Sequence, residues 1–528
     1  MSKLRVGLLV GTEGPKAWHE QIITILAGHE QIDIVVIRAS HDLRKRSGSV
    51  WRALDRLETL LAHRLFKTSR AEVPLATEGF DALPIETFRD AAETMSSDAC
   101  PDLLICLDDP KAALQLPRVP KHGLWYLTFD GVVGTGDDVG LSGWYRGRHV
   151  VDAALWRMHA PDQEASLIER AHLGVFKPSW SVNRSRHLWR AALLITDNIL
   201  RLAARDSNFF AKMEKPANLA PSAKLPHLHP LLLGLRCARR LAGHIWQKLV
   251  YVEQWQVLAT RSTKDMLKPD AYARLEPPPD RFWADPFAVQ QGDRDYIFVE
   301  ELRYETNRGE IAVLEHRDGQ LISAKAIIAE PYHMSYPHIV EHAGDLYMVP
   351  ETRQKRSIDI WKNTSFPDEW TSLGALMENV SAVDTTLFRH DERWWMFTNI
   401  SRTENLRSAD ELHAFYTDDS SPVTKAWKPH RQNPLVRDTR FARQGGRVFV
   451  DDQGRLIRSA QDSAIRYGYA VLFFHVLDLT PDSFKQTLLH KVEPDWHDDV
   501  IGMHSFERRD DLCIFDACFQ KKRLRFPI

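Results

Sequence analysis

Apolar and polar positions follow one repeated pattern through the C-terminal half of the chain. In residues 335–352, SYPHIVEHAGDLYMVPET, a short apolar segment is followed by a polar turn and by a second apolar segment that ends at the carboxylate of Glu351. Two such segments joined by a polar turn predict a β-hairpin. The pattern begins again at Phe282, Val383, Gly446 and Met503.

The five hairpins begin about 45 to 65 residues apart, as expected when each repeat forms one four-stranded sheet of a radial array. The pattern therefore predicts an all-β, five-bladed β-propeller. The first strand of each blade lines the central channel, so a polar residue near its start should face the axis. The residues at these positions are Asp285, His338, Asp384, Arg447 and His504. The alternative for each of them is that it only hydrogen-bonds a strand end.

The N-terminal half alternates strands with helices instead. The expected elements are strands at 4–10, 32–37, 101–107 and 123–129 and helices at 18–27, 50–67 and 86–95. The strand at 101–107 is apolar throughout, which is typical of a parallel sheet covered on both faces. This layout is Rossmann-like. Gly11 and Gly14 do not complete a G-x-G-x-x-G motif, so a dinucleotide site is not favoured.

Two amphipathic helices, at 185–213 and 231–250, flank a Pro-rich segment at 215–230. We therefore expect an α/β domain at 1–213, a linker with a basic helix at 214–250 and the propeller at 251–528. A basic amphipathic helix can lie on an acidic membrane surface. We favour the alternative that it packs the two domains together.

The composition of the chain indicates how many domains to expect, which partners are not favoured and in which compartment the protein lies. A length of 528 residues suggests two or three domains, and a formal charge of −2 gives no indication of a nucleic-acid partner. The five cysteines lack metal-type spacing, so we expect reduced thiols, no metal site and a cytoplasmic protein. The N-terminus predicts a strand rather than a signal peptide, and no apolar run reaches the ~18 residues of a membrane span, so membrane contact should be at most peripheral.

Residues 122–158, HGLWYLTFDGVVGTGDDVGLSGWYRGRHVVDAALWRM, resemble the formyltransferase domain shared by methionyl-tRNA formyltransferase and sugar N-formyltransferases. The resemblance implies an Asn-x-His pair and a later Asp at the active site. Tyr126 and Thr128 replace the pair here, and Asp162 is the nearest carboxylate to the third position. Thr cannot transfer protons near neutral pH as His does. We expect a degenerate formyltransferase site; its cofactor is unknown and 10-formyltetrahydrofolate is disfavoured.

The segments FWADPF, SYPHIVEHAGDLYMVPE, VDTTLF, HRQNPL, GGRVF and RLIRSAQDSAIRYG carry a second resemblance. Residues 251–528 are similar to the five-bladed propeller at the N-termini of glucosamine inositolphosphorylceramide transferases. They resemble furanosidase-type glycoside hydrolases more distantly. The resemblance implies a glycan or glycolipid substrate and a role in bacterial envelope-glycan synthesis.

Glycoside hydrolysis needs two carboxylates, one on each side of the scissile bond. The hydrolase resemblance gives Asp285 the role of base and Asp384 that of tuning the acid. The acid itself is not matched, because ARQGGRVF offers Arg443 and Arg447, and Glu351 is the candidate replacement. Arginine favours an anionic group such as phosphate or uronate. The candidate substrate contacts are Tyr336, His338, Arg443, Arg447, Gln461, Tyr467 and His504.

Four functions remain open at this point. We favour a carbohydrate-active protein of transferase type, with group transfer at the propeller funnel. The alternatives are a glycoside hydrolase acting on furanosides with Asp285 as base and Glu351 as acid, a non-catalytic glycan-binding module, and formyl transfer to an amino sugar.

Overall fold

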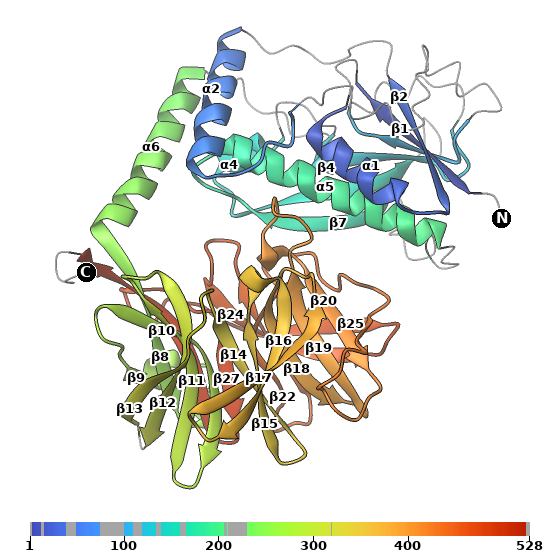
Figure 1. Cartoon of the computed structure of the whole chain (residues 1–528). Helices are drawn as coiled ribbons and strands as arrows, with labels where there is room; N and C mark the ends of the chain where they lie inside the picture. Colours follow the sequence, from blue (N-terminus) through green and yellow to red (C-terminus); the bar gives the residue numbers. More distant parts are fainter. Residues whose placement is uncertain are drawn as a thin grey trace. The chain divides into compact units, whose positions relative to one another are not determined.

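The computed structural model describes residues 3–11, 15–38, 49–73, 100–108, 119–133, 139–158, 165–204, 209, 230–317 and 319–523. The chain forms two compact units, Met1–His244 and Ile245–Ile528. We call them the α/β unit and the β unit and describe each by itself (Figure 1). The predicted helix at 86–95 and nearly all of the Pro-rich segment lie outside the described residues.

The α/β unit is built on a mixed sheet in the order β2-β1-β3-β4-β6-β7. Its strands are β1 (Leu4–Val10), β2 (Ile32–Arg38), β3 (Leu103–Cys106), β4 (Leu124–Phe129), β6 (Val150–Met158) and β7 (Ser166–Gly174), with β5 (Val132–Val133) beside β4. β1 to β4 run parallel, whereas β6 and β7 are antiparallel to their neighbours. The buried apolar side chains of β3 and β4 explain why these segments lie inside the sheet.

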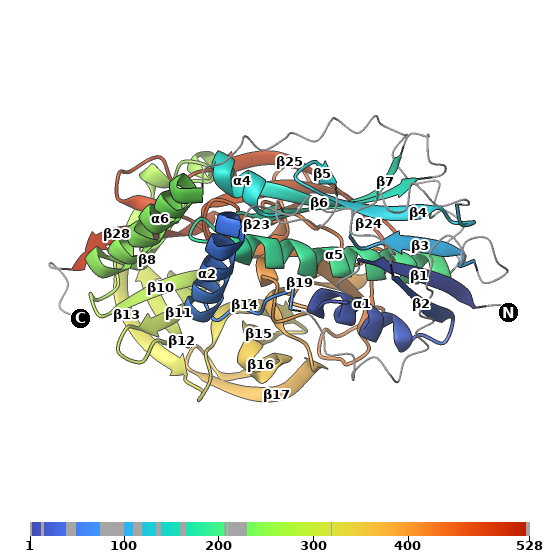
Figure 2. The same ribbon diagram turned by 90° about the horizontal axis from the view of Figure 1, so that it is seen from above.

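The described helices of this unit are α1 (Ala17–Ala27), α2 (Ser49–Leu65), α4 (Leu141–Arg146) and α5 (Trp180–Ala203), and α6 (Pro230–Val250) leads from it into the β unit. α1 packs against α5, and α5 also contacts β6 and β7 (Figure 2). α5 begins before the predicted residue 185 because the Ser179 hydroxyl caps it, accepting the backbone N–H of Val182 at 3.1 Å. Among the described helices, none is long and apolar enough to cross a membrane.

The β unit consists of short antiparallel sheets. Three have four strands each: β10 (Arg281–Gln291), β11 (Arg294–Arg303), β12 (Arg308–Arg317) and β13 (Gln320–Ile328); β14 (Ser335–His342), β15 (Asp345–Glu351), β16 (Ser357–Ser365) and β17 (Glu369–Glu378); β18 (Ala382–His390), β19 (Arg393–Ile400), β20 (Leu412–Thr417) and β21 (Lys428–Pro429).

The remaining strands form a nine-stranded sheet that separates into two groups. One group is β22 (Arg443–Val450), β23 (Leu456–Asp462), β24 (Ala470–Leu479) and β25 (Phe484–Val492). The other is β27 (Phe506–Arg509), β28 (Leu512–Lys522), β8 (Tyr251–Thr260) and β9 (Ala273–Leu275), with β26 (Val500–Gly502) beside β28. The two groups join through a single residue pair, Gly446 and Phe506. The β unit therefore contains five strand groups.

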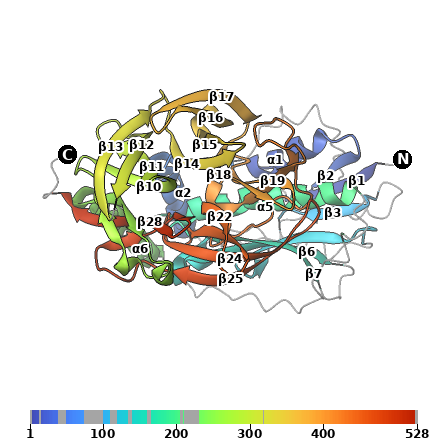
Figure 3. The ribbon, with the colours of Figure 1, turned by 90° about the horizontal axis from the view of Figure 1, so that it is seen from below.

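The five groups close into a ring. The first strands β10, β14, β18, β22 and β27 each contact the next, and β27 contacts β10 (Figure 3). A separate apolar core fills each space between neighbouring groups, including the space between the last group and the first. The last group combines both ends of the unit, because β8 pairs with β28 from Tyr251–Lys522 to Thr260–Cys513.

A β-bulge interrupts four of the first strands at equivalent places, after Ala284, Ser335, Val383 and Gln444. Asp285, Tyr336 and Asp384 follow the first three of these positions and have positive φ values of 52°, 47° and 51°. A bulge bends its strand and redirects a side chain, and a non-glycine residue adopts positive φ only where its surroundings enforce it. The structural counterpart of Asp285 and Asp384 in the second group is thus Tyr336, where the sequence pattern had indicated His338.

Candidate functional site

The site is built from the bulges of the first strands and from polar residues of the second strands that lie beside them. These second-strand residues are Glu300, Glu351, Asn399, Gln461 and Asp516. Glu300, Glu351, Asn399 and Gln461 lie toward the C-terminal ends of their strands, whereas Asp516 lies in the middle of β28 among buried apolar residues. Three of the five are carboxylates, and Asp285 and Asp384 add two more.

The first part of the site surrounds Asp285. Its Oδ1 accepts the hydroxyl of Ser505 at 2.7 Å and lies 3.6 Å from Nε2 of His504. Asp516 stabilises this arrangement through both carboxylate oxygens. Its Oδ2 accepts the Asp285 backbone N–H at 2.9 Å and lies 2.6 Å from Nδ1 of His504. Its Oδ1 accepts the backbone N–H groups of His504 and Ser505. Trp255 stacks on the His504 ring with 4.1 Å between centroids. Asp285, His504 and Asp516 therefore form one buried polar unit.

The second part surrounds Asp384. Arg443 binds this carboxylate through Nε and Nη2, the latter at 3.2 Å from Oδ1. Gln461 also donates to Asp384 at 3.2 Å, and its amide is fixed by the backbone oxygen of Gln444 at 2.7 Å. Tyr467 lies under the Arg443 guanidinium, 4.7 Å from ring centroid to Cζ, and its side chain remains exposed. Burial disfavours the charge of Arg443, but Asp384 outweighs burial and raises its pKa.

The electrostatics separate the carboxylates into two classes. Burial and then the charge of Asp384 raise the pKa of Glu351 from 4.5 to about 8. Burial also raises the pKa of Asp285, but its neighbour His504 opposes this effect, and the result is about 6. Burial together with Asp285 and Glu351 raises the pKa of Glu300 well above its ordinary value. Near neutral pH the site therefore holds a protonated carboxyl at Glu351 and an ionised one at Asp285.

Burial disfavours the imidazolium form of His504, but the charges of Asp516 and Asp285 together outweigh burial and raise its pKa. A protonated His504 supports the ionised form of Asp285. Among the described residues, Asp285, His504 and Asp516 are the one set of possible metal ligands whose atoms all lie within 4.8 Å of one another. Both oxygens of Asp516 already accept N–H groups, so we assign the set to hydrogen bonding rather than to a metal.

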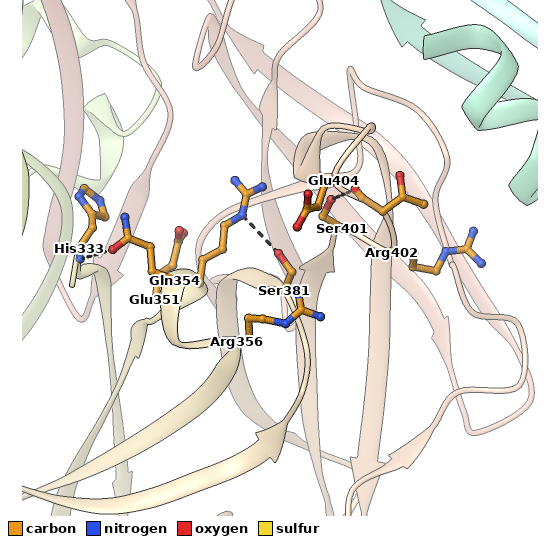
Figure 4. Close-up of a pocket in the computed structure, with 10 residues that line it drawn as sticks. His333, Glu351, Gln354, Arg356, Ser381, Ser401, Arg402 and Glu404 are labelled. Carbon is orange, nitrogen blue, oxygen red and sulfur yellow. Dashed lines mark hydrogen bonds between the residues drawn. The ribbon is translucent and has the colours of Figure 1, made fainter. Parts of the chain in front are cut away.

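Glu351 also borders a pocket of about 910 Å³, a size typical of small-molecule sites. The pocket is lined by His333, Glu351, Arg353, Gln354, Arg356, Ser381, Ser401, Arg402, Thr403 and Glu404, most of which Figure 4 labels. Its lining is polar and rich in arginine. Arg402 pairs with Glu411, with Nη2 2.9 Å from Oε1.

Two arginines of the pocket are available to a ligand. Arg353 donates only to the Ser381 hydroxyl, at 3.3 Å, and within the described ranges neither Arg353 nor Arg356 forms an ion pair. His333 also lines the pocket (Figure 4), and its Nε2 is 3.3 Å from Glu300. Burial lowers the pKa of His333, so its ring is neutral at neutral pH. The pocket thus combines guanidinium donors with the proton-bearing Glu351.

The structure does not bring three predicted contacts to this site. His338 is buried, its Nε2 lies 2.9 Å from the Leu387 carbonyl oxygen, and burial lowers its pKa to about 3. Arg447 donates to Glu507 at 2.9 Å and to the Ile339 oxygen at 3.0 Å.

The third is Tyr336, whose buried hydroxyl lies 2.8 Å from that of Thr386 and also contacts the backbone of Gly446. Each of these three side chains contacts polar atoms of neighbouring strands, so it stabilises the interior of the ring.

Glu300, Ser505 and Asp516 were not among the predicted site residues. A signal for one of them was present: FVEE places a carboxylate after an apolar segment, as MVPE does for Glu351. Asp516 instead interrupts the apolar segment CIFDACF. Ser505 has no such signal, because only the tertiary contact with Asp285 gives it a role.

Two of the three residues compared with the formyltransferase site, Tyr126 and Thr128, lie on β4 of the α/β unit. Tyr126 is buried in β4, and burial raises its pKa to about 12. Thr128 is also buried and accepts the indole N–H of Trp156 at 2.9 Å. Asp162 lies outside the described residues. Tyr126 and Thr128 therefore pack the sheet, and the formyltransferase resemblance stays a prediction.

Residues 271–498 match the family model "Glucosamine inositolphosphorylceramide transferase 1, N-terminal". The protein of that name from Oryza sativa subsp. japonica is 32% identical over 212 residues, which are 39% of this chain and 28% of the relative. The Arabidopsis thaliana protein is 30% identical over 212 residues, 39% of this chain and 27% of that relative. The β unit is thus related in sequence to the N-terminal region of these transferases. The chain spans less than a third of their length.

Solved structures that resemble the chain include glycoside hydrolases. Zg3597, a family 117 glycoside hydrolase of Zobellia galactanivorans, has a TM-score of 0.30 at 11% identity and covers 50% of this chain and 91% of that one. A GH43_1 enzyme from Xanthomonas citri complexed with xylose has a TM-score of 0.33 at 11% identity and covers 46% and 88%. The α-L-arabinanase of Cellvibrio cellulosa has a TM-score of 0.32 at 16% identity and covers 46% and 90%.

Proposed function

We propose that the β unit is a five-bladed β-propeller that binds a saccharide in the pocket beside Glu351 and acts on its glycosidic bond. The observation that carries this proposal is the difference in pKa between two buried-site carboxylates whose charges interact, Asp285 with a pKa of about 6 and Glu351 with a pKa of about 8. At neutral pH one accepts a proton and the other donates one. The sequence relation to a transferase whose name includes glucosamine supports a sugar ligand.

In this proposal the chemistry is general acid–base catalysis. Glu351 donates its proton to the glycosidic oxygen as the bond from that oxygen to the anomeric carbon breaks. Asp285 takes the proton of the attacking hydroxyl, which belongs to water in hydrolysis or to a sugar in group transfer. Arg443 pairs with Asp384, and the Asp384 charge raises the pKa of Glu351, which keeps the proton on Glu351 until the leaving oxygen takes it. We favour transfer over hydrolysis.

The arginines of the pocket indicate the kind of saccharide. Arg353 and Arg356 are suited to an anionic substituent, because a guanidinium donates paired hydrogen bonds to phosphate or carboxylate oxygens. The relatives' name includes an inositolphosphoryl group, which fits a phosphate-bearing ligand. We therefore expect an anionic glycan or glycolipid head group rather than a neutral furanoside.

The test uses the full chain with phosphorylated and neutral oligosaccharides, with binding measured by calorimetry and products by chromatography. Asp285→Asn and Glu351→Gln should each lower turnover by about 100-fold or more while binding persists. Glu404→Gln is the matched control, because it removes an exposed carboxylate from the same pocket. A transfer product supports transferase chemistry, and free reducing sugar alone supports hydrolysis. Turnover that survives both substitutions would refute the assignment of the pair.

A second candidate is a saccharide-binding module without catalysis of its own. It is favoured by the match to an N-terminal region, since the chain spans only 28% of the rice relative's length. This candidate predicts binding of the same anionic saccharides with no product. It also predicts that Arg353→Gln lowers affinity, while Asp285→Asn changes affinity alone.

A further inference from the structure

The N-terminal part of helix α6 exposes apolar side chains. Within the α/β unit, Leu231 and Leu235 lie about one helical turn apart on one face, Leu232 lies beside them, and their exposed fractions are 67% to 68%. An amphipathic helix of a globular protein normally turns its apolar stripe toward its core. Leu233 is the one buried residue of α6, so the normal arrangement does not hold here.

The opposite face of α6 is fixed to the α/β unit. Cys237 contacts the backbone oxygen of Pro178 at 3.6 Å, and Arg240 donates to the backbone oxygen of Trp144 at 2.8 Å while its guanidinium lies 4.3 Å from the centre of the Trp144 ring. Arg236 stacks in the same way on Tyr145. These contacts determine which face of the helix is presented outward.

Helix α2 extends the same apolar surface. It lies next to α6, because a side chain at Gly234 would meet Leu54 at 3.5 Å and the rings of Phe66 and His244 lie 6.1 Å apart (Figures 1 and 2). We use the name α2–α6 surface for the exposed apolar residues of the two helices. Within the α/β unit they are Val50, Leu57, Leu60, Leu61, Leu65, Leu231, Leu232 and Leu235.

The charges beside this surface are of one sign. Arg236 and Arg240 lie on the opposite face of α6, so the exposed charged residue of this helix within the α/β unit is Arg239, and α2 exposes Arg52, Arg56 and Arg64. The two acidic residues of α2 are used internally. Asp55 accepts from Arg184 at 2.7 Å and from the Trp180 indole at 2.9 Å, and Glu58 accepts the Ser179 hydroxyl.

From this combination we infer that the α2–α6 surface docks on an anionic lipid bilayer. Leucine side chains enter the interfacial region of a membrane, and neighbouring Arg side chains bind anionic head groups. The positive charge without exposed carboxylates favours such a bilayer over a second copy of this chain, because the same positive surface would repel itself. The docking is peripheral and does not depend on the saccharide chemistry proposed for the β unit.

The test is co-sedimentation of the full chain with vesicles of phosphatidylcholine, with and without phosphatidylglycerol. Binding should require phosphatidylglycerol and weaken with salt. Leu235→Glu should weaken binding about tenfold or more, and Arg239→Gln about fivefold. Leu477→Glu is the matched control, because it places the same charge at an exposed leucine of β24, and it should leave binding unchanged.

Three results would overturn the inference. The first is no binding to anionic vesicles by a chain whose circular dichroism shows it folded. The second is equal binding by the Leu235→Glu and Leu477→Glu variants. The third is a dimer in light scattering that Leu235→Glu dissociates, without vesicle binding, since the surface would then join two copies. Arg239→Gln keeps the test decisive if Leu235→Glu fails to fold.

Discussion

Replacing Glu351 by Gln should stabilise the β unit at alkaline pH while it removes the proposed proton donor. Burial and the charge of Asp384 raise the pKa of Glu351 from 4.5 to about 8. A carboxyl with a higher pKa in the folded chain binds more protons folded than unfolded. Its contribution to stability is therefore complete below pH 4.5 and is lost as the pH rises to about 8.

The size of the effect follows from the two pKa values. The difference between 4.5 and about 8, at 1.36 kcal/mol per pH unit, corresponds to about 5 kcal/mol as an upper bound. Solvent in the adjoining pocket screens part of this, so we expect about 2 to 4 kcal/mol. Gln has nearly the same shape and no charge to lose. The stability difference between the variant and the natural chain should be near zero at pH 4.5 and largest above pH 8.

Scanning calorimetry of the full chain at a series of pH values measures this difference. The transition of the β unit should rise by about 4 °C or more at alkaline pH in Glu351→Gln. Glu404→Gln, which removes an exposed carboxylate of the same pocket, should give a difference that does not grow with pH. A Glu351→Gln variant that is less stable at every pH, or equally stabilised at every pH, would show that Glu351 is not held protonated by its surroundings.

Three further predictions concern activity and packing. The kcat/KM for a saccharide should follow a bell-shaped pH profile with limbs near 6 and 8, because Asp285 must be ionised and Glu351 protonated; a flat profile across this range would contradict it. Arg443→Gln should cost about 3 to 5 kcal/mol in urea unfolding, because it leaves the buried Asp384 without its cation, and Arg443→Lys should recover part of this. Gly446→Ala should lower the melting temperature of the β unit, because the added Cβ would lie 1.9 Å from a backbone oxygen of β27 at a φ of 121°; an unchanged melting temperature would contradict the close approach.

The hairpin pattern was sufficient to predict the hairpin that contains the first strand of each group and three of the five carboxylates of the candidate site. Asp285 and Asp384 follow short apolar segments, and Glu351 ends one, so their positions depend on local alternation that a sequence displays. The same alternation misplaced His338 by two residues relative to Tyr336. A bulge inserts residues without changing the apolar pattern around it, so the register across the bulge is not visible in the sequence.

The hydrogen bonds around Asp285 could not be predicted for a different reason. Ser505 and Asp516 reach Asp285 across more than 200 residues of chain, and only closure of the ring brings them together. The stripe on α6 is a third case. Its helical period was evident, but period alone does not say whether a stripe faces a core or the solvent, and the expectation that the helix packs the two domains together stays a prediction.

The pairing of β8 with β28 has a consequence for biosynthesis. Thr260 of β8 pairs with Cys513 of β28, which the ribosome adds about 250 residues later. At 5 to 20 residues per second, this synthesis takes roughly 12 to 50 s. During that time β8 has an unpaired edge that can pair with other nascent chains. This protein should therefore depend on chaperones that shield such edges. A premature stop codon before Leu512 would leave the edge open permanently and direct the product to aggregation or proteolysis.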